Sequence, residues 1–369
     1  MMLIGFFLFF ATVVAAHFFV ARQAWTRLRG AHETDIDLTY TRRDNWLAQS
    51  FRTQLAAWTS SPAQQTHAKF RVFETGRERV IESTHDRTGI RMANSDICSF
   101  TGDFSCPAEA AFTREISVLG NAKIGAQSRL QAITAGGRME IAYDTAIQRW
   151  ADCDGEMVLG PGVTIGARAT SRYAIRVGER VKAQMLSAPT ITTAGYVERI
   201  FDRTSVPARG ALQFPLVHND DVAAPPAAGD QNRMLLMGEN CVLHRGDLAF
   251  SLPVEIHCRL IVLGSFSCPA GSLLHQDLKA EGDIAIGAES LVKGSLVAGG
   301  NLALFDGCVF EGMLHSAQDI LLATGVRGLA RPKPVAAYAA ATLYAESNVA
   351  VEGKLAAGGE VRTRKFIRK

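Results

Sequence analysis

Residues 282–299 read GDIAIGAESLVKGSLVAG and define the repeating unit of this chain. The same 18-residue row recurs in register, with further rows starting at Gly246, Gly264, Gly300 and Gln318. A fixed period with aligned apolar columns is typical of a solenoid. Apolar and polar residues alternate within each row, which makes the unit β rather than α. Eighteen residues fit one three-sided coil of a parallel β-helix, so the sequence predicts a mainly β, three-sided parallel β-helix solenoid with 18-residue coils.

A second, earlier set of rows starts at Gly102, Gly120, Gly137 and Gly155, and a fifth coil is expected from Tyr173. The two sets share more than the coil pattern. Residues 102–108 read GDFSCPA and residues 264–270 read GSFSCPA, 162 positions later. The shared Ser-Cys-Pro corner favours an internal duplication. The sequence leaves open whether the two blocks stack coaxially or side by side, and the C-terminal coil has no evident cap.

The inward columns of these rows are the predicted core. Glycine permits positive φ, and an Asx residue after it bonds back to the backbone, so the start of each row marks a corner. Cysteines in these columns are interpreted as small buried hydrophobes rather than reactive thiols. The chain has seven cysteines without C-x-x-C spacing, which indicates neither a disulfide framework nor a zinc site. The predicted core columns contain Phe104, Cys106, Ile124, Ile141, Leu159, Phe266, Cys268, Ile284, Ile286, Leu296, Leu302, Leu304 and Leu314.

The N-terminal segment predicts a membrane anchor at residues 1–21. Residues Leu3 to Val20 form an apolar run broken only by His17, close to the length that spans a bilayer. Basic residues follow the run and none precedes it, which predicts a single-pass protein of the bacterial inner membrane with its body in the cytoplasm. A cleaved signal peptide, which would make the body periplasmic, is the alternative. The predicted membrane-surface residues are Arg22, Arg27, Arg29, Arg364, Lys365, Arg368 and Lys369; a solvated, aggregation-blocking tail is the alternative for the last four.

The rest of the chain divides by composition. Residues 22–95 are expected to form an α/β membrane-proximal region, followed by block 1 (96–190), an insertion or linker (191–240), and block 2 with a basic tail (241–369). Trp46, Leu47, Phe51, Leu55 and Trp58 recur at helical spacing, which predicts an amphipathic helix. Its apolar face is expected to pack on the solenoid or, alternatively, to lie against the membrane surface. Residues 74–77 join two apolar runs as a hairpin turn. The Ala-rich stretch 335–340 is expected to bulge out or form a helical turn.

Composition and motifs exclude several functions. The net charge of +3 is too small to argue for nucleic acid. The chain lacks the phosphate-binding, dinucleotide-binding, zinc-protease and nucleophile-elbow motifs. His257 and His275 stack one coil apart on an outward face and could ligate a metal, but the sequence shows no evident third ligand. We therefore expect no catalytic set, cofactor or metal.

Three Ile-Gly-Ala steps, at residues 124–129, 165–170 and 286–291, each fit one unit of the hexapeptide repeat. Hexapeptide acyltransferases build β-helices from such units in tandem, whereas here the units are isolated. An acyltransferase acting on a sugar or lipid precursor is therefore the enzymatic alternative.

The Gly-Asx-hydrophobic rows, the Ile-Gly-Ala steps and the phrase GSLVAGG at residues 294–300 resemble the bactofilin, or polymer-forming cytoskeletal, family over roughly 100–190 and 246–335. That resemblance implies a right-handed β-helix that polymerises end to end without nucleotide and associates with the inner membrane. It also implies partners among envelope-synthesis proteins. This chain departs from the family pattern by its two blocks, N-terminal segment and long insertion.

Three hypotheses follow. The first is a non-enzymatic, membrane-anchored scaffold for envelope or cell-shape machinery, which self-associates through its end coils. The second is the acyltransferase. The third is a periplasmic β-helix that binds polysaccharide along an outward face.

Overall fold

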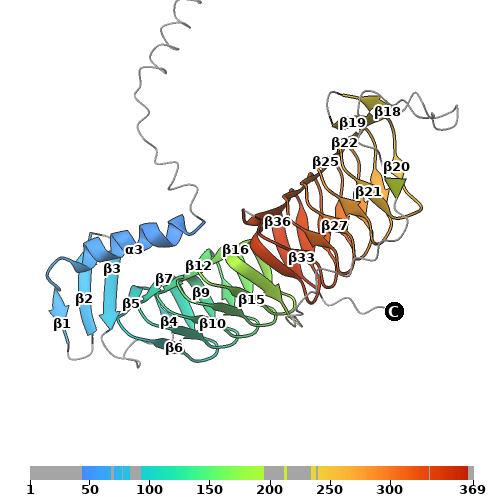
Figure 1. The fold of residues 1–369 in the computed structure, drawn as a ribbon. Helices are drawn as coiled ribbons and strands as arrows, with labels where there is room; N and C mark the ends of the chain where they lie inside the picture. Colours follow the sequence, from blue (N-terminus) through green and yellow to red (C-terminus); the bar gives the residue numbers. More distant parts are fainter. Residues whose placement is uncertain are drawn as a thin grey trace, which may run out of the picture. The chain divides into compact units, whose positions relative to one another are not determined.

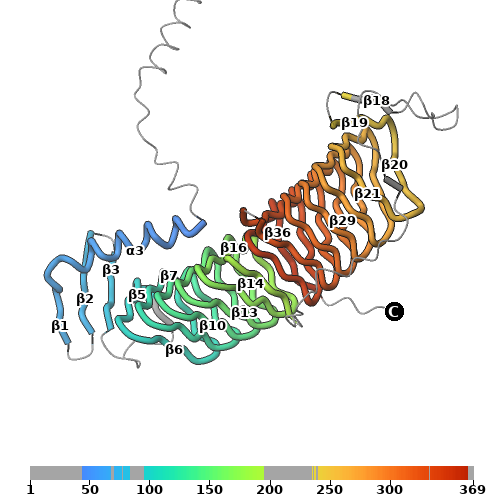
Figure 2. The backbone as a smooth tube through the Cα atoms, viewed as in Figure 1, coloured from blue at the N-terminus to red at the C-terminus, as the bar shows by residue number. Residues whose placement is uncertain are grey.

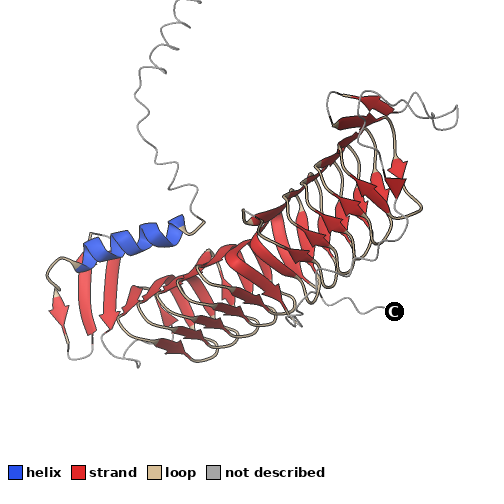
Figure 3. Cartoon of the chain, in the orientation of Figure 1, coloured by secondary structure: helices blue, strands red, loops and turns tan. Residues whose placement is uncertain are grey.

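The computed structural model describes residues 44–67, 70–76, 78–83, 93–194, 212–213, 234–237, 240–331 and 333–364. Within them the chain is mainly β, a parallel β-solenoid of about 13 turns with coils of about 18 residues and one short helix (Figures 1 and 3). The predicted solenoid and its internal repeats are therefore confirmed. Among these residues no helix is both long and apolar enough to cross a membrane. The predicted anchor at 1–21 lies outside the described residues.

The N-terminal described region contains a helix and three antiparallel strands. They are α3 (Trp46–Thr59), β1 (Gln65–Thr66), β2 (Phe70–Thr75) and β3 (Glu78–Ser83). The predicted hairpin is confirmed, since β2 pairs antiparallel with β3. The helix buries Phe51 and Leu55 among Phe73, Val80 and Ile97 of the strands below it, so the predicted apolar face of the helix is also confirmed.

The first solenoid comprises β4 to β16. Its strands pair in parallel, and the 17-residue step between Ala122 and Met139 keeps the register. The strands are β4 (Ala93–Asn94), β5 (Ile97–Phe100), β6 (Phe104–Cys106), β7 (Ala111–Val118), β8 (Ala122–Ile124), β9 (Arg129–Ala135), β10 (Met139–Ile141), β11 (Ala146–Ile147), β12 (Trp150–Cys153), β13 (Met157–Leu159), β14 (Thr164–Ser171), β15 (Ile175–Val177) and β16 (Lys182–Thr193). The coil expected from Tyr173 is present as β15 and β16.

Two short described strands lie in the segment predicted to be a linker. β17 (Leu212–Gln213) pairs in parallel with β21, and β18 (Met234–Leu236) forms an antiparallel hairpin with β19. The predicted linker therefore contributes strands to the start of the next solenoid.

The second solenoid comprises β19 to β36, and its coils can be followed along the tube in Figure 2. It is the more regular of the two, with three short strands in most coils. Ile284 pairs with Phe266 on one side and Leu302 on the other, 18 residues away in each direction. Its strands are β19 (Cys241–His244), β20 (Leu248–Ala249), β21 (Val254–Ile256), β22 (Arg259–Val262), β23 (Phe266–Cys268), β24 (Leu273–Leu274), β25 (Leu278–Ala280), β26 (Ile284–Ile286), β27 (Leu291–Val292), β28 (Leu296–Ala298), β29 (Leu302–Leu304), β30 (Val309–Phe310), β31 (Leu314–Ser316), β32 (Ile320–Leu322), β33 (Arg327–Gly328), β34 (Val335–Ala339), β35 (Thr342–Ala345) and β36 (Ala350–Thr363).

The Ala-rich stretch is a strand. Residues 335–339 form β34, so the expected bulge or helical turn was wrong. Leu314 pairs with Ala337, a step of 23 residues in place of 18, and the extra residues lie between β33 and β34. Small alternating side chains at Val335, Ala337 and Ala339 suit the interior of the coil, and all three are buried.

Candidate functional site

The two solenoids meet at their C-terminal strands. β16, the last strand of the first solenoid, pairs antiparallel with β36, the last strand of the second. Strands of successive coils within one solenoid pair in parallel. When the C-terminal ends of two solenoids face each other, their last strands must instead pair antiparallel. The question that the sequence left open is thereby answered for these strands: the blocks join end to end through their last coils.

The joint is built like the core of a coil. Ala183 faces Val361, Leu186 faces Leu355 and Ile191 faces Val351, all buried. One continuous cluster of buried apolar residues runs from Cys98 through the joint to Val361. The C-terminal coil, which seemed uncapped in sequence, is covered by the first solenoid.

Two threonines close the joint reciprocally. The Thr193 hydroxyl donates to the Glu346 carbonyl oxygen (2.8 Å) and accepts from the Val349 amide (2.9 Å). From the other side, the Thr363 hydroxyl donates to the Gly178 carbonyl oxygen (2.8 Å) and accepts from the Val181 amide (3.0 Å).

The turns that these threonines contact match as well. Arg180 and Asn348 occupy corresponding places in them and have φ of 59° and 61°. Each solenoid therefore offers the other the same strand, hydroxyl and turn, as expected for duplicated units related by an approximate two-fold axis.

The opposite end of each solenoid is covered by antiparallel strands. β3 pairs in parallel with β5, and β2 and β1 follow it, so the first coil of the first solenoid does not end the sheet. The β18–β19 hairpin lies at the start of the second solenoid. In the described parts of the chain, antiparallel pairing is confined to these two ends and the joint.

The helix α3 is fixed to the first solenoid by a partly buried polar cluster. Arg52 donates to Thr134 Oγ1 (2.7 Å), Asp152 Oδ2 (3.0 Å), Asp154 Oδ2 (3.0 Å) and the Ala135 carbonyl oxygen (3.2 Å). Burial raises the pKa of the Asp152 carboxyl, while the hydrogen bond from Thr170 and the charge of Arg52 oppose that shift. Sequence reasoning missed this cluster because Thr134, Asp152 and Thr170 form a polar column that looks solvated until a helix covers it.

The predicted core residues lie where the columns placed them. All thirteen are buried, and all belong to the single solenoid cluster. Burial raises the pKa of the Cys106 and Cys268 thiols, which keeps them protonated and unreactive. The seven cysteines are all free.

Two of the three Ile-Gly-Ala steps, at residues 124–129 and 286–291, are corners, whereas the step at 165–170 lies within strand β14. A Cβ on Gly125 would lie 2.2 Å from the Pro107 carbonyl carbon, and one on Gly287 would lie 2.2 Å from that of Pro269. The buried serines that follow, Ser128 and Ser290, accept hydrogen bonds from amides of neighbouring coils. Close packing between coils therefore requires glycine at these two corners.

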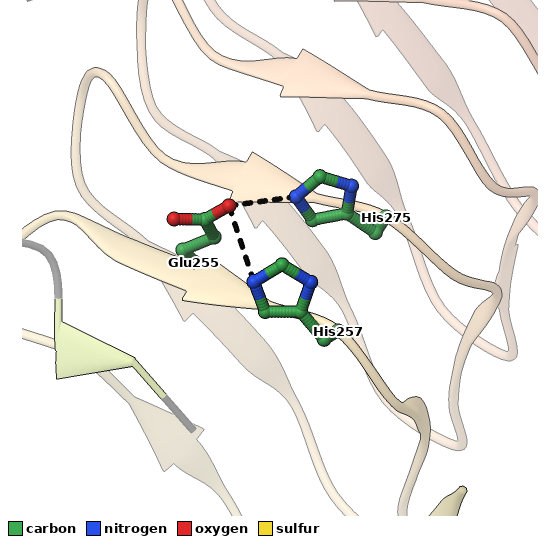
Figure 4. A group of neighbouring side chains, drawn as sticks. All are labelled: Glu255, His257 and His275. Atoms are coloured by element: carbon green, nitrogen blue, oxygen red, sulfur yellow. Dashed lines mark hydrogen bonds and ion pairs between the residues drawn. The ribbon is translucent and has the colours of Figure 1, made fainter. Parts of the chain in front are cut away.

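A polar group outside the core involves the two stacked histidines (Figure 4). The His257 and His275 rings stack with centroids 4.2 Å apart. Glu255 Oε1 lies 2.8 Å from His275 Nε2 and 3.1 Å from His257 Nε2. The hydrogen bond from His275, with smaller help from the charge of His257, lowers the pKa of the Glu255 carboxyl. The expectation that no third ligand accompanies the histidines was wrong, because residues two apart on a strand share a face and Glu255 precedes His257 by two.

The predicted membrane-surface residues lie mostly outside the described parts of the chain. Arg22, Arg27, Arg29, Lys365, Arg368 and Lys369 fall there. Arg364 is described: its amide donates to the Ala345 carbonyl oxygen, and its guanidinium lies over the Tyr344 ring, 4.1 Å from the centroid.

Comparisons with known proteins return no match, whether with family models, curated proteins or solved structures.

Proposed function

We propose that this chain is a non-enzymatic, membrane-anchored β-solenoid scaffold, similar to the bactofilins, that positions envelope or cell-shape machinery. The observation that carries the proposal is the joint. Coils of this chain associate end on through an antiparallel strand pair, a continuous apolar core and two reciprocal threonines. Such an interface is what an assembly of solenoids needs.

The joint also favours a finite unit over an open filament. An unpaired coil edge is a template for another chain, and here both C-terminal edges are used within one molecule. The opposite ends carry antiparallel strands instead of bare coils. We therefore propose that partners bind the side faces of the solenoids, and that self-association through the outer ends is secondary.

Membrane attachment is the part of the proposal that rests on sequence. The apolar run Leu3 to Val20 and the arginines after it favour an anchor with the body in the cytoplasm. A reporter fused after Lys369 tests the orientation. Reporter activity only on the periplasmic side would contradict the cytoplasmic scaffold and favour a periplasmic solenoid that binds polysaccharide.

Assembly is tested with the full chain purified in detergent. Sedimentation across a wide concentration range, without nucleotide, should give one constant mass, and negative-stain images should contain discrete particles. Filaments would refute the finite unit and leave the scaffold standing. Saturable binding of acyl-CoA would refute the scaffold and favour the acyltransferase.

A further inference from the structure

We propose that Glu255, His257 and His275 form a binding site for a divalent transition-metal ion of the zinc type, on an outward face of the second solenoid (Figure 4). The proposal is independent of the scaffold function. It rests on the placement, spacing and chemistry of three side chains.

The repeat creates the placement. Glu255 lies in β21 and His257 directly follows that strand, so their side chains lie on the same face. Leu274 pairs with Ile256, and His275 is therefore stacked over His257 one coil later. The backbone ladder sets the spacing of the two imidazoles.

The donor atoms already converge. One atom from each residue lies within 4.8 Å of the others. Donors on tetrahedral zinc, with bonds of about 2.0–2.1 Å, lie roughly 3.3 Å apart. The Glu255–His275 and Glu255–His257 separations of 2.8 and 3.1 Å are close to that value. The two imidazole rings, now stacked at an interplanar angle of 13°, must tilt so that both Nε2 lone pairs meet one ion.

The ligand set selects the class of ion. Two imidazoles and one carboxylate suit zinc and its neighbours, whereas magnesium and calcium prefer oxygen alone. The three side chains are 21–35% exposed, which leaves a fourth position open to water. An ion here would link two successive coils near the outer end of the second solenoid.

Lys293 opposes binding and provides a sharp test. Its Nζ lies 3.3 Å from His275 Nδ1. When a metal binds Nε2, the neutral imidazole carries its proton on Nδ1, and the ammonium can no longer donate to that atom. Lys293 must therefore turn away, and its positive charge repels the ion. The variant Lys293→Gln should bind zinc more tightly, by about tenfold, the scale of outer-shell effects on metal affinity.

The experiment is calorimetric titration of zinc chloride into the full chain after chelator treatment and dialysis. We expect one zinc ion per chain, a higher melting temperature with zinc, and loss of both effects in the double variant His257→Gln/His275→Gln. The matched control is His315→Gln, an outward histidine whose ring stacks on Tyr338 instead. That variant should bind like the unmodified chain.

Thiols are the competing zinc ligands, because Cys241 and Cys258 are only partly buried. The variant Cys241→Ser/Cys258→Ser should retain the binding. Cobalt in place of zinc should give visible bands without thiolate charge transfer. Absence of saturable binding, or binding unchanged in the histidine double variant, overturns the proposal. If that variant does not fold, an affinity that fails to rise in Lys293→Gln overturns it instead.

Discussion

Trp150 in the first solenoid and Met313 in the second occupy the same place in the repeat, thirteen residues after the row starts Gly137 and Gly300. Trp150 is 3% exposed and Met313 is 56% exposed. The difference is the helix α3, whose Phe51 ring lies 5.8 Å from that of Trp150. One coil geometry therefore supports two surfaces, one covered by a helix of the same chain and one left accessible.

The polar residues of the two faces follow the same division. Asp152, two residues after Trp150, is buried and held by Arg52. His315, two residues after Met313, is partly exposed and stacks on Tyr338. The comparison teaches that the repeat sets which way a side chain points, while the helix decides whether an outward side chain is buried.

The largest effect should follow from removing the aromatic contact under the helix. Trp150→Ala deletes a buried ring and leaves a cavity against Phe51, so we expect a loss of about 3 kcal/mol in the free energy of unfolding. A helix of 14 residues is marginal on its own, and the amides of α3 should exchange with solvent much faster. Urea unfolding followed by circular dichroism, together with hydrogen exchange, measures both.

Met313→Ala is the matched control at the same place in the repeat. An exposed side chain contributes little to stability, so the free energy of unfolding of this variant should stay within about 0.5 kcal/mol of that of the unmodified chain. Equal losses in the two variants would contradict the division between a covered and an accessible face.

The sequence predicted the parts of the fold that repeat locally. A column such as Ile284, Leu302 and Ile320 shows which residues of successive coils pair, because each coil needs an apolar side chain at that place. The helix face with Phe51 and Leu55, and the hairpin across Gly76, are also local patterns. These elements could be predicted because their signals lie within one row or one turn.

The parts that escaped prediction depend on contacts between distant segments. Nothing near Thr193 or Thr363 signals that each accepts an amide of the other solenoid. Arg52 contacts residues 82 to 102 positions away. Glu255 escapes prediction because the 18-residue column shows the two histidines alone, while the signal for Glu255 is its two-residue spacing to His257.

A smaller effect is expected from the joint, where the two solenoids are equivalent. Thr193→Val leaves the Glu346 carbonyl and the Val349 amide buried without their partner, and Thr363→Val does the same to Gly178 and Val181. We expect the free energy of unfolding of each variant to fall by about 2 kcal/mol. Hydrogen exchange gives a specific measurement: the Val349 amide should exchange faster in the first variant and the Val181 amide in the second.

Thr192→Val is the control for the joint, since Thr192 is half-buried on the other side of the same strand. It should leave both amides protected. If one threonine variant cost much more than the other, the joint would not consist of two equivalent halves.

The smallest effect should come from the cluster under the helix, and it should depend on pH. Arg52→Met removes the positive charge beside Asp152. It should lower the free energy of unfolding by about 1.5 kcal/mol near neutral pH, which is the scale of a hydrogen bond to a charged group. The folded pKa of Asp152 is raised by burial, so the native state holds a proton to higher pH than the unfolded chain does. This carboxyl therefore lowers stability as pH rises from its unfolded pKa through its folded pKa.

Without Arg52 that folded pKa should rise further. The stability gap between Arg52→Met and the unmodified chain should then be largest at about pH 8 and shrink toward about pH 5, as Asp152 takes up its proton. The control is Arg176→Met, which removes an exposed partner of Glu156 and should cost little at either pH. A gap that stays the same across this pH range would mean that Arg52 holds the helix through its contacts with Thr134 and Ala135 and not through the buried carboxylate.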